Sequence, residues 1–399
     1  MKNKLLLSIL LSFIFCLLSS QIRVRLFNEF SPDYAIFTVN SGKYSISNGS
    51  GSTIIAGTEA PLVIARVNSK IYVKLRNREA FLGDSVEING LTGSDNFSLR
   101  INAAGTSERN YSGDLKCYSD METLLLVNTC DIEQYLAGVV KAEGGNGKNE
   151  EYFRTQAVIA RTYTYKYFNK HIIDRYNLCD DTHCQVYNGL ISDSLIINAV
   201  QHTSGLVITT PDSLLINSAF HSNCGGETSP SEYAWVTSQT YLIKVTDPYC
   251  RNSRNALWNK KISLNDWTDI MIKNGYTGIL SDPSVFSFSQ AKRVPDYVAG
   301  SFSMPLRTIR SAMTLRSSFF SISVDGDSLL LEGRGYGHGV GLCQEGAMMM
   351  AMKGFTYQQI IDFYYFGVLI MDIKNAVFLP QNPSSAALGA RKGVKSDTN

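Results

Sequence analysis

The stretch DIEQYLAGVVKAEGGNGKNEEYFRTQAVIARTYTYKY, residues 131–167, decides the fold of this chain. Its pattern predicts two helices joined by a glycine-rich turn. In the first helix, apolar residues recur at the i, i+3, i+4, i+7, i+8 spacing of one buried face. That face consists of Ile132, Tyr135, Leu136, Val139 and Val140. Asp131, with Gln134 three residues later, predicts a capping box at the start of the helix.

The next residue on the buried face is Glu143, and Gly144, Gly145 and Gly147 then end the helix. Burial and the negative end of the helix dipole both raise the pKa of a carboxyl group in this position. A carboxylic acid that keeps its proton near neutral pH is suited to general acid catalysis. The alternative is an ordinary surface glutamate in the last helical turn, and the pattern alone leaves both interpretations open.

The composition is that of an ordinary globular protein. The chain has 399 residues, of which 44% are hydrophobic and 18% charged, with a formal net charge of +2. This length is enough for two or three packed units. The near-neutral charge and the absence of a long basic run in the sequence give no support for nucleic-acid binding.

The first 21 residues have the order of a secretory signal peptide. Lys2 and Lys4 precede an apolar run over residues 5–18, and Ser19, Ser20 and Gln21 follow. The run is short for a membrane span, which needs about 20 apolar residues. We expect cleavage near Gln21, which leaves a mature chain without a membrane span. This mature chain is expected to be secreted, periplasmic or located in the cell envelope. An uncleaved anchor is the alternative.

Residues 22–126 predict a small antiparallel β unit. Short apolar runs are separated by the turn signals Asn48-Gly49, Asn89-Gly90 and Ser112-Gly113. The last run, LLLVN at residues 124–128, leads into the Asp131 helix. Residues 127–378 are expected to form a second domain that carries the chemistry, and residues 379–399 a disordered tail.

Six motifs follow one another in a characteristic order. They are YLAGVVKAE at residues 135–143, TQAVIARTY at 155–163, HCQVYNG at 183–189, FHSNCGGET at 220–228, YLIKVTD at 241–247 and GRGYGHGVGLCQEGA at 333–347. The ordered set resembles the stage II sporulation protein D family, which includes the amidase enhancer proteins. The resemblance covers most of the chain after the leader.

This resemblance implies a peptidoglycan lytic transglycosylase, which cuts cell-wall glycan strands and leaves 1,6-anhydro-muramyl ends. The single catalytic acid of the family matches Glu143. The alternative that the resemblance also allows is a non-catalytic amidase enhancer, which binds peptidoglycan and stimulates a cell-wall amidase. The expected partners are therefore glycan strands, either complete or stripped of stem peptides, and, for an enhancer, a cell-wall amidase. The expected fold class is α+β, with antiparallel β units and helices packed around a central substrate cleft.

Several residues in these motifs are candidates for substrate binding. They are Arg161, Gln185, Tyr187, His221, Ser222, Gly225, Gly226, His338 and Gln344. Arg161 equally fits a buried structural cation, and Gln185 and Tyr187 equally fit loop packing. His221 and Ser222 are adjacent on a predicted strand and would point to opposite faces, which argues against a serine-hydrolase triad.

Glycine occupies every second position from Gly333 to Gly341. The spacing does not fit a dinucleotide-binding fingerprint. Period two predicts an extended strand with one face made of glycine alone. His338 would then project from the other face, either as a groove-lining residue or as a core hydrogen-bonding group.

The cysteines and histidines suggest disulfides or metal. Without Cys16 in the leader, seven of the eight cysteines remain. Spacing suggests the pairs Cys117–Cys130 and Cys224–Cys250. The family resemblance implies zinc held by Cys179, His183 and the upstream His171, although the Cys–His spacing is one residue short. The adjacent Cys184 is not expected to reach the same ion as His183.

Two alternatives concern this same segment. One is a Cys179–Cys184 disulfide in a tight loop. The other makes the chain a zinc amidase that uses Cys179, His183 and a further ligand. Toward the C-terminus, residues 344–353 predict a helix ended by Gly354, and Thr356 with Gln359 predicts a second capping box. A set of strands is expected to start near Phe286 to Val294.

Overall fold

The computed structural model describes residues 21–49, 53–75, 81–145, 147–235, 237–279 and 283–377. The chain divides into two compact units. Unit 1 comprises residues 1–146, 156–207 and 372–399, and unit 2 comprises residues 147–155 and 208–371. The expected leader, apart from Gln21, and the expected tail lie outside the described residues.

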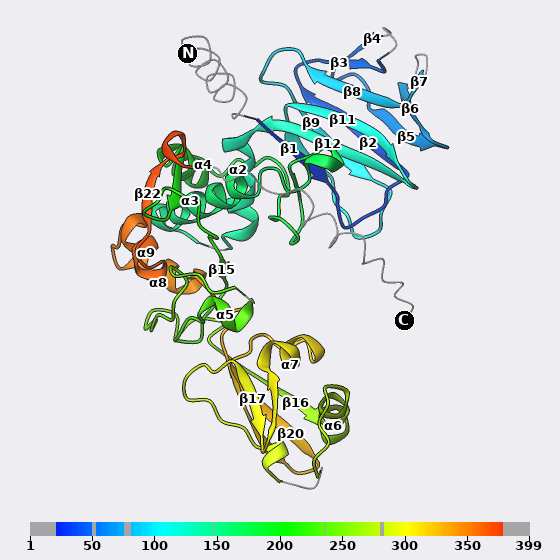
Figure 1. Ribbon diagram of the computed structural model, residues 1–399. Coiled ribbons are helices and arrows are strands. Elements are labelled where there is room, and N and C mark those ends of the chain that lie inside the picture. Colours follow the sequence, from blue (N-terminus) through cyan, green and yellow to red (C-terminus); the bar gives the residue numbers. More distant parts are fainter. Residues whose placement is uncertain are drawn as a thin grey trace, which may run out of the picture. The chain divides into compact units, whose positions relative to one another are not determined.

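Unit 1 is built on two antiparallel sheets (Figure 1). In order, the seven-stranded sheet contains β13 (Leu178–Cys179), β1 (Gln21–Leu26), β12 (Thr123–Asp131), β11 (Asp114–Asp120), β8 (Ser85–Gly90), β3 (Tyr44–Ser47) and β4 (Thr53–Ala56). The six-stranded sheet contains β10 (Arg109–Ser112), β9 (Asn96–Ile101), β2 (Tyr34–Ser41), β5 (Leu62–Val67), β6 (Lys70–Leu75) and β7 (Phe81–Gly83). Only β13 pairs in parallel, with β1, among the described strands of these sheets.

Aromatic side chains from both sheets meet in the core of unit 1. The ring of Phe37 on β2 lies 5.4 Å from Tyr44 on β3 and 4.7 Å from Phe97 on β9. Alternation of buried and exposed residues along β2 matches a strand with one face in the core. The expected antiparallel β unit is therefore present, but β12 crosses the expected boundary at residue 126 because it pairs with both β1 and β11.

One expected turn in this unit is wrong. Asn89 and Gly90 lie within β8, where they pair with Ser45 and Tyr44. The chain turns instead just beyond, where the carboxylate of Asp95 accepts hydrogen bonds from three backbone N–H groups of the loop and of Lys43. Because Asp95 satisfies the backbone N–H groups of this later loop, the strand can continue through Asn89-Gly90, a dipeptide that usually marks a turn. The other signals hold, with Gly49 and Gly113 at φ of 77° and 75°.

The described part of unit 1 contains three α-helices, of which the first two are the helices expected from residues 131–167. They are α2 (Ile132–Glu143), α3 (Glu150–Lys166), whose first residues belong to unit 2, and α4 (Ser194–His202). Every residue of the expected apolar face of α2 is buried. Asp131 caps α2 by accepting from the N–H groups of Glu133 and Gln134. The capping box is only half formed, because the Gln134 side chain accepts from the Ser112 hydroxyl instead.

Unit 2 contains a three-stranded antiparallel sheet with its own core. The sheet consists of β16 (Leu257–Ser263), β20 (Ser328–Arg334) and β19 (Phe320–Asp325). Beside it are α6 (Leu264–Lys273), α7 (Leu306–Ala312) and the hairpin of β17 (Asp296–Ala299) and β18 (Phe302–Pro305). Trp267 is fully buried in this core, and its indole N–H donates to the Val285 carbonyl.

The set of strands expected to start near Phe286 to Val294 begins just beyond these residues, with β17 at Asp296. A 3₁₀ turn, Pro283–Phe286, precedes a single bridge between Phe288 and Ile322 on β19. Gln290 then uses its side-chain amide to bond the carbonyls of Ser318 and Phe320. A side chain thus takes the place of backbone ladder bonds at the edge of this sheet.

The rest of unit 2 gathers around a short parallel pair, β15 (Phe220–His221) and β21 (Leu342–Cys343). It also includes the short α5 (Ser231–Ala234), α8 (Gln344–Met352) and α9 (Tyr357–Tyr364). The strands β14 (Leu206–Thr209) and β22 (Leu369–Asp372) form another pair. The capping box of Thr356 and Gln359 is confirmed, and Gly354 follows α8 with φ of 88°.

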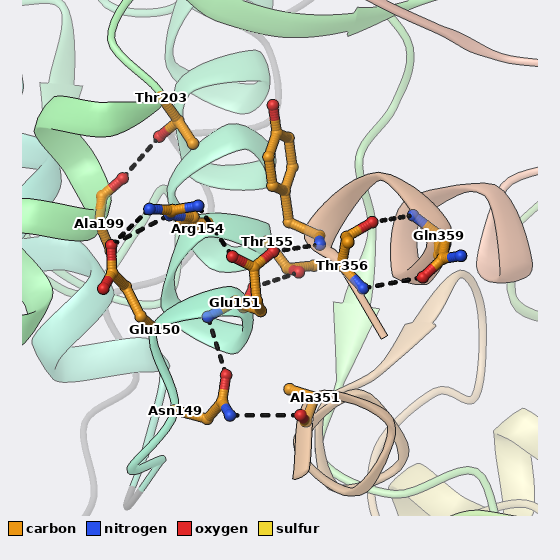
Figure 2. A network of polar contacts seen from close by, with 11 residues as sticks. Asn149, Glu150, Glu151, Arg154, Thr155, Ala199, Thr203, Ala351, Thr356 and Gln359 are labelled. Atoms are coloured by element: carbon orange, nitrogen blue, oxygen red, sulfur yellow. Dashed lines mark hydrogen bonds and ion pairs between the residues drawn. The ribbon is translucent and has the colours of Figure 1, made fainter. Parts of the chain in front are cut away.

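The first turn of α3 is tied to α8 and α9 by polar contacts (Figure 2). The Asn149 amide donates to the Ala351 carbonyl at 3.2 Å, and its oxygen caps α3 by accepting from the N–H of Glu151. The Glu151 carboxylate accepts from the N–H of Tyr357 at 2.7 Å and pairs with Arg154. These bonds connect the start of α3 with the end of α8 and the start of α9, about two hundred residues away in sequence.

The expected fold class, α+β with antiparallel sheets, is confirmed, and the central substrate cleft stays a prediction. Among the described residues, no helix combines the length and the apolar character that crossing a membrane requires.

Candidate functional site

Glu143 lies in the last turn of α2, half-buried, as the helical pattern predicts. Its Oε1 accepts a hydrogen bond of 2.8 Å from the backbone N–H of Val186. Burial raises the pKa of Glu143 above its ordinary value, and the bond from Val186 opposes this in part. The carboxyl group is therefore partly desolvated rather than lying on the open surface, which favours a protonated state and fits a general acid.

A shallow depression of about 210 Å³ in unit 1 is lined in part by Val186, the residue whose N–H binds Glu143. Val186 lines the depression, together with Asn28, Arg109, Asp181 and Asn188. Asp180 fixes its floor by accepting from the N–H groups of Phe27 and Asn28 and by pairing with Arg109 at 3.0 Å. The residue that holds Glu143 thus also belongs to a small polar hollow.

The structure places Arg161, Gln185 and Tyr187 inside the core of unit 1. Arg161 is completely buried, pairs with both carboxylate oxygens of Glu133 and donates to the carbonyls of Val200 and Leu206. The Gln185 oxygen accepts from the Thr164 hydroxyl at 2.9 Å. The ring of Tyr187 lies 4.9 Å from that of Tyr135. These contacts favour the packing alternatives over substrate contact.

Close packing also accounts for a glycine of α2. A Cβ atom on Gly138 would lie 2.5 Å from both the Gly189 carbonyl and the Tyr187 ring. Because no side chain fits there, the HCQVYNG segment lies directly against the helix that carries Glu143. Sequence alone did not indicate this role for Gly138.

Four side chains of unit 1, the His171 cluster, gather their ligand atoms within 4.8 Å of one another. The cluster consists of His171, Cys179, His183 and Cys184. Cys179 Sγ lies 3.5 Å from His183 Nδ1, and Cys184 Sγ lies 3.5 Å from His171 Nε2. Three of these residues were expected ligands, and the argument against Cys184 is wrong because the loop turns its thiol toward the same point as His183.

The surroundings of the His171 cluster suit a metal. Asp174 accepts from His171 Nδ1 and so directs Nε2 toward the thiols. Asp181 Oδ1 accepts from the N–H of His183 and from the Cys179 thiol. Hydrogen bonding from Cys179 and His171 lowers the pKa of the Cys184 thiol. Two thiols and two imidazoles are a donor set that tetrahedral zinc uses, so these residues fit that ion.

None of the expected disulfides is present, since every cysteine among the described residues is unbridged. Cys117 on β11 lies opposite Leu126, whereas Cys130 on β12 lies opposite Ile22 on β1, so register keeps the two thiols apart. Cys224 and Cys250 do lie together, with their sulfur atoms 3.3 Å apart.

In unit 2, the glycine strip after Gly333 is not an extended strand. Gly335, Gly337, Gly339 and Gly341 have φ between 69° and 112°, which is the left-handed side of the backbone map. Glycine recurs at every second position because the backbone there repeatedly takes a positive φ, which residues with a side chain rarely adopt. A Cβ atom on Gly341 would lie 2.1 Å from the Ala219 carbonyl, so the strip packs directly on the chain beside β15.

The Cys-Gly-Gly loop packs against the same strip. Gly225 has φ of 71°, and a Cβ atom there would lie 2.7 Å from the Cβ of Arg334. Ser222 is half-buried, and its carbonyl accepts from the N–H of Glu345. Gln344 begins α8 and is buried. In this structure the close approach at Gly225 is to the protein's own backbone.

His338 and His221 lie side by side in unit 2, with ring centroids 5.6 Å apart. His221 is buried and its Nδ1 contacts the Val340 carbonyl, while the N–H of Val340 donates to His338 Nδ1. Burial, then neighbouring charge, lowers the pKa of His221 far below normal and that of His338 to about 4. The nearby charges include Arg293 and Arg310. Both imidazoles are therefore neutral at pH 7.

An open pocket of about 780 Å³ lies beside His338. Trp235 lines it, with its ring 5.5 Å from that of His338, and so do Lys273, Arg307 and Arg310. An aromatic face and three cations suit a sugar that carries carboxylate groups. No sequence motif connects these cations, because α6 and α7 bring them together from separate parts of the chain.

Acid should destabilise the protein through these two histidines. Their ordinary pKa of 6.5 applies in the unfolded chain, so the unfolded state takes up protons first as the pH falls. Stability is complete above about pH 6.5 and falls toward pH 4, with a loss of about 1–2 kcal/mol from His338 between pH 7 and pH 5. Urea unfolding at both pH values measures this loss. The variant His338→Gln should reduce it, and an equal loss in that variant would contradict the assignment.

Comparisons with known proteins agree with the motifs. Residues 120–210, which include α2, Glu143 and the His171 cluster, match the family model described as Stage II sporulation protein. This match confirms the resemblance of this part of the chain to that family, which the motifs predict.

Particular relatives extend the similarity beyond that domain. The chain is 28% identical over 262 residues to Stage II sporulation protein D of Bacillus amyloliquefaciens, covering 62% of this chain and 76% of that protein. It is 28% identical over 288 residues to the Amidase enhancer of Bacillus subtilis, covering 59% of this chain and 40% of that protein. An uncharacterised protein of Brachyspira hyodysenteriae is 29% identical over 270 residues, covering 66% of this chain and 72% of that protein.

Proposed function

We propose that this protein is an exported lytic transglycosylase that cleaves the glycan strands of bacterial peptidoglycan, with Glu143 as its acid and base. The observation that carries the proposal is the half-buried Glu143 carboxyl group at the end of α2, whose pKa burial raises. Its place within the family-matched residues supports the substrate class.

The proposed chemistry needs only one carboxyl group. Glu143 protonates the glycosidic oxygen, positive charge develops at the sugar C1, and the 6-hydroxyl of the same muramyl residue attacks that carbon. The resulting carboxylate then takes the hydroxyl proton. Because the nucleophile belongs to the substrate, no second carboxylate has to activate water, unlike in the paired-carboxylate glycosidases. Attack within one molecule also gains from proximity.

The residues around Glu143 suit these steps. The Val186 N–H orients the carboxyl group of Glu143. The same N–H can also donate to Glu143 when this residue is a carboxylate. The small polar hollow that Val186 lines offers hydrogen bonds to sugar hydroxyls from Asn28, Arg109 and Asn188. In unit 2, the pocket of His338, Trp235 and its arginines offers a second place for acidic sugar or stem-peptide groups.

The His171 cluster is proposed to hold zinc as a structural ion. Its residues would bind the ion through Nε2 of His171, Nδ1 of His183 and the two thiols. Zinc at this place would brace the loop that carries Val186. All four protein donors are provided by the chain, which leaves no open coordination position for a zinc amidase.

The name of one relative, Amidase enhancer, supports a second candidate function. In that case the chain binds peptidoglycan and stimulates an amidase without cutting glycan. Incubation of the purified protein alone with peptide-free glycan strands separates the two functions. Soluble glycan fragments are expected from a transglycosylase, whereas intact strands would favour the enhancer.

A further inference from the structure

Four buried side chains of unit 2, the Cys224 cluster, lie close together, and none of them belongs to the His171 cluster of unit 1. The cluster consists of Cys224, Asp247, Cys250 and Cys343, and their ligand atoms lie within 4.8 Å of one another. Cys224 Sγ lies 3.2 Å from Asp247 Oδ2 and 3.3 Å from Cys250 Sγ. Sulfur ligands of one tetrahedral zinc ion lie about 3.8 Å apart, since the Zn–S bond is about 2.3 Å. The two sulfur atoms would therefore have to move only slightly apart for both to bind one ion.

The fold brings these residues together from three separate segments. Cys343 ends β21, which pairs in parallel with β15, and Cys224 follows β15 by three residues. Asp247 is the last residue of the YLIKVTD motif and Cys250 follows it by three residues, and the N–H of Asp247 donates to the Gly226 carbonyl. Rigid backbone contacts thus place all four side chains before any ion binds.

Hydrogen bonds from residues outside the cluster orient the Asp247 carboxylate. Oδ1 accepts from the N–H of Tyr249, and Oδ2 accepts from the Tyr364 hydroxyl at 2.9 Å. Gly346 makes room for this arrangement, because a Cβ atom there would lie 2.3 Å from Asp247 Oδ2. Directed carboxylates of this kind are typical of metal sites, where the surrounding hydrogen bonds orient the ligand.

The sulfur atoms also have donors and positive charge nearby. The N–H of Cys224 donates to Cys343 Sγ at 3.3 Å. Arg293 is buried and donates to the Cys224 carbonyl at 2.7 Å, which places its guanidinium group beside the cluster. A single guanidinium offsets only part of the charge that three thiolates and a carboxylate would carry, and a divalent cation would offset more of it.

A disulfide between Cys224 and Cys250 is the competing interpretation. It would use two of the three thiols and leave Cys343 and the Asp247 carboxylate buried beside it without a role. An ion uses all four groups at once.

We propose that Cys224, Asp247, Cys250 and Cys343 form a second metal site, which holds a structural zinc ion. Three soft thiolates and one carboxylate oxygen select a borderline-soft divalent ion with tetrahedral preference. Each thiol loses its proton to solvent as it binds, and no electron is transferred. The four ligands come from the protein, so the site is closed. It would fasten the Cys-Gly-Gly loop and the start of α8 to the loop of Asp247.

Metal counting by native mass spectrometry tests this proposal independently of any activity on peptidoglycan. The protein is purified with zinc chloride and reductant, and a Cys179→Ser/Cys184→Ser variant removes the His171 cluster. This variant should retain one zinc per chain, and adding Cys343→Ser should reduce the count to zero. Adding Cys117→Ala instead, a buried thiol on β11, should leave one zinc. A folded double variant with no zinc would overturn the proposal, as would a triple variant with Cys343→Ser that keeps its zinc.

A second measurement needs no substitution in the cluster. The wild-type protein is denatured in chelator without reductant and treated with iodoacetamide. Alkylation of Cys224, Cys250 and Cys343 together is the expected result, because metal binding keeps all three as thiols. A peptide in which a disulfide joins Cys224 to Cys250 would contradict the metal site. This readout decides the question even where Cys343→Ser prevents folding.

Discussion

Replacement of Glu143 by glutamine is expected to abolish release of glycan fragments while leaving the fold intact. Loss of a general acid typically costs a factor of about 10²–10⁴ in rate, and here the same group also serves as the base. Glutamine has the same shape and can still accept the bond from the Val186 N–H. The rate of solubilisation of peptide-free glycan measures the effect.

The stability of this variant provides a separate check. Because burial raises the pKa of Glu143, the carboxylate is less favourable in the folded state than in the unfolded state. Its contribution to stability is present at low pH and is lost as the pH rises through the folded pKa. Glu143→Gln should therefore unfold at the same temperature as wild type or higher at pH 7. A lower melting temperature would mean that the glutamate has a structural role.

Glu122→Gln is the matched control. Glu122 is exposed in the turn between β11 and β12, so its neutralisation removes the same charge from unit 1 without touching the proposed site. This control should cleave glycan at the wild-type rate. If Glu143→Gln also does so, Glu143 is not the acid. If the wild-type protein stimulates an amidase and Glu143→Gln does so equally, the enhancer function is favoured.

Removal of metal from the His171 cluster is expected to cause the largest loss of stability. Binding to a structural zinc site contributes on the order of 10 kcal/mol in small zinc domains. The sheet and helix core of unit 1 would remain, so a smaller but clear decrease in melting temperature is expected. Cys184→Ser should lower zinc content by one ion per chain and reproduce much of the decrease caused by chelator.

The effect should extend to catalysis, because β13 and the loop after it lead directly to Val186. A loosened loop would weaken the hydrogen bond that orients Glu143. Cys130→Ala is the control, since this buried thiol on β12 belongs to neither cluster. Equal zinc content in wild type and folded Cys184→Ser would show that the His171 cluster does not hold the ion.

The α2 helix was predictable because its information is local. Periodicity placed Ile132, Tyr135 and Val140 on one face, and counting one further turn placed Glu143 half-buried at its end. Asp131 was recognised as the cap for the same reason. Its expected reciprocal partner, Gln134, instead binds Ser112, a residue of β10, and no local pattern contains that contact.

The errors arose where backbone conformation or distant packing decides the outcome. Glycine at every second position is compatible with a strand and with repeated positive φ, and only the neighbouring Ala219 carbonyl shows why Gly341 must be glycine. The reach of Cys184 depended on how its loop folds. Convergence of Cys343 with Cys224 depended on a parallel strand pair between segments more than a hundred residues apart.

Mass spectrometry of the sugar ends released from purified glycan strands tests the central claim most directly. The transfer to an internal hydroxyl predicts muramyl ends that are one water lighter than hydrolysis products, and it predicts their loss in Glu143→Gln. Ordinary reducing ends, free stem peptides or intact strands from the wild-type protein would contradict it.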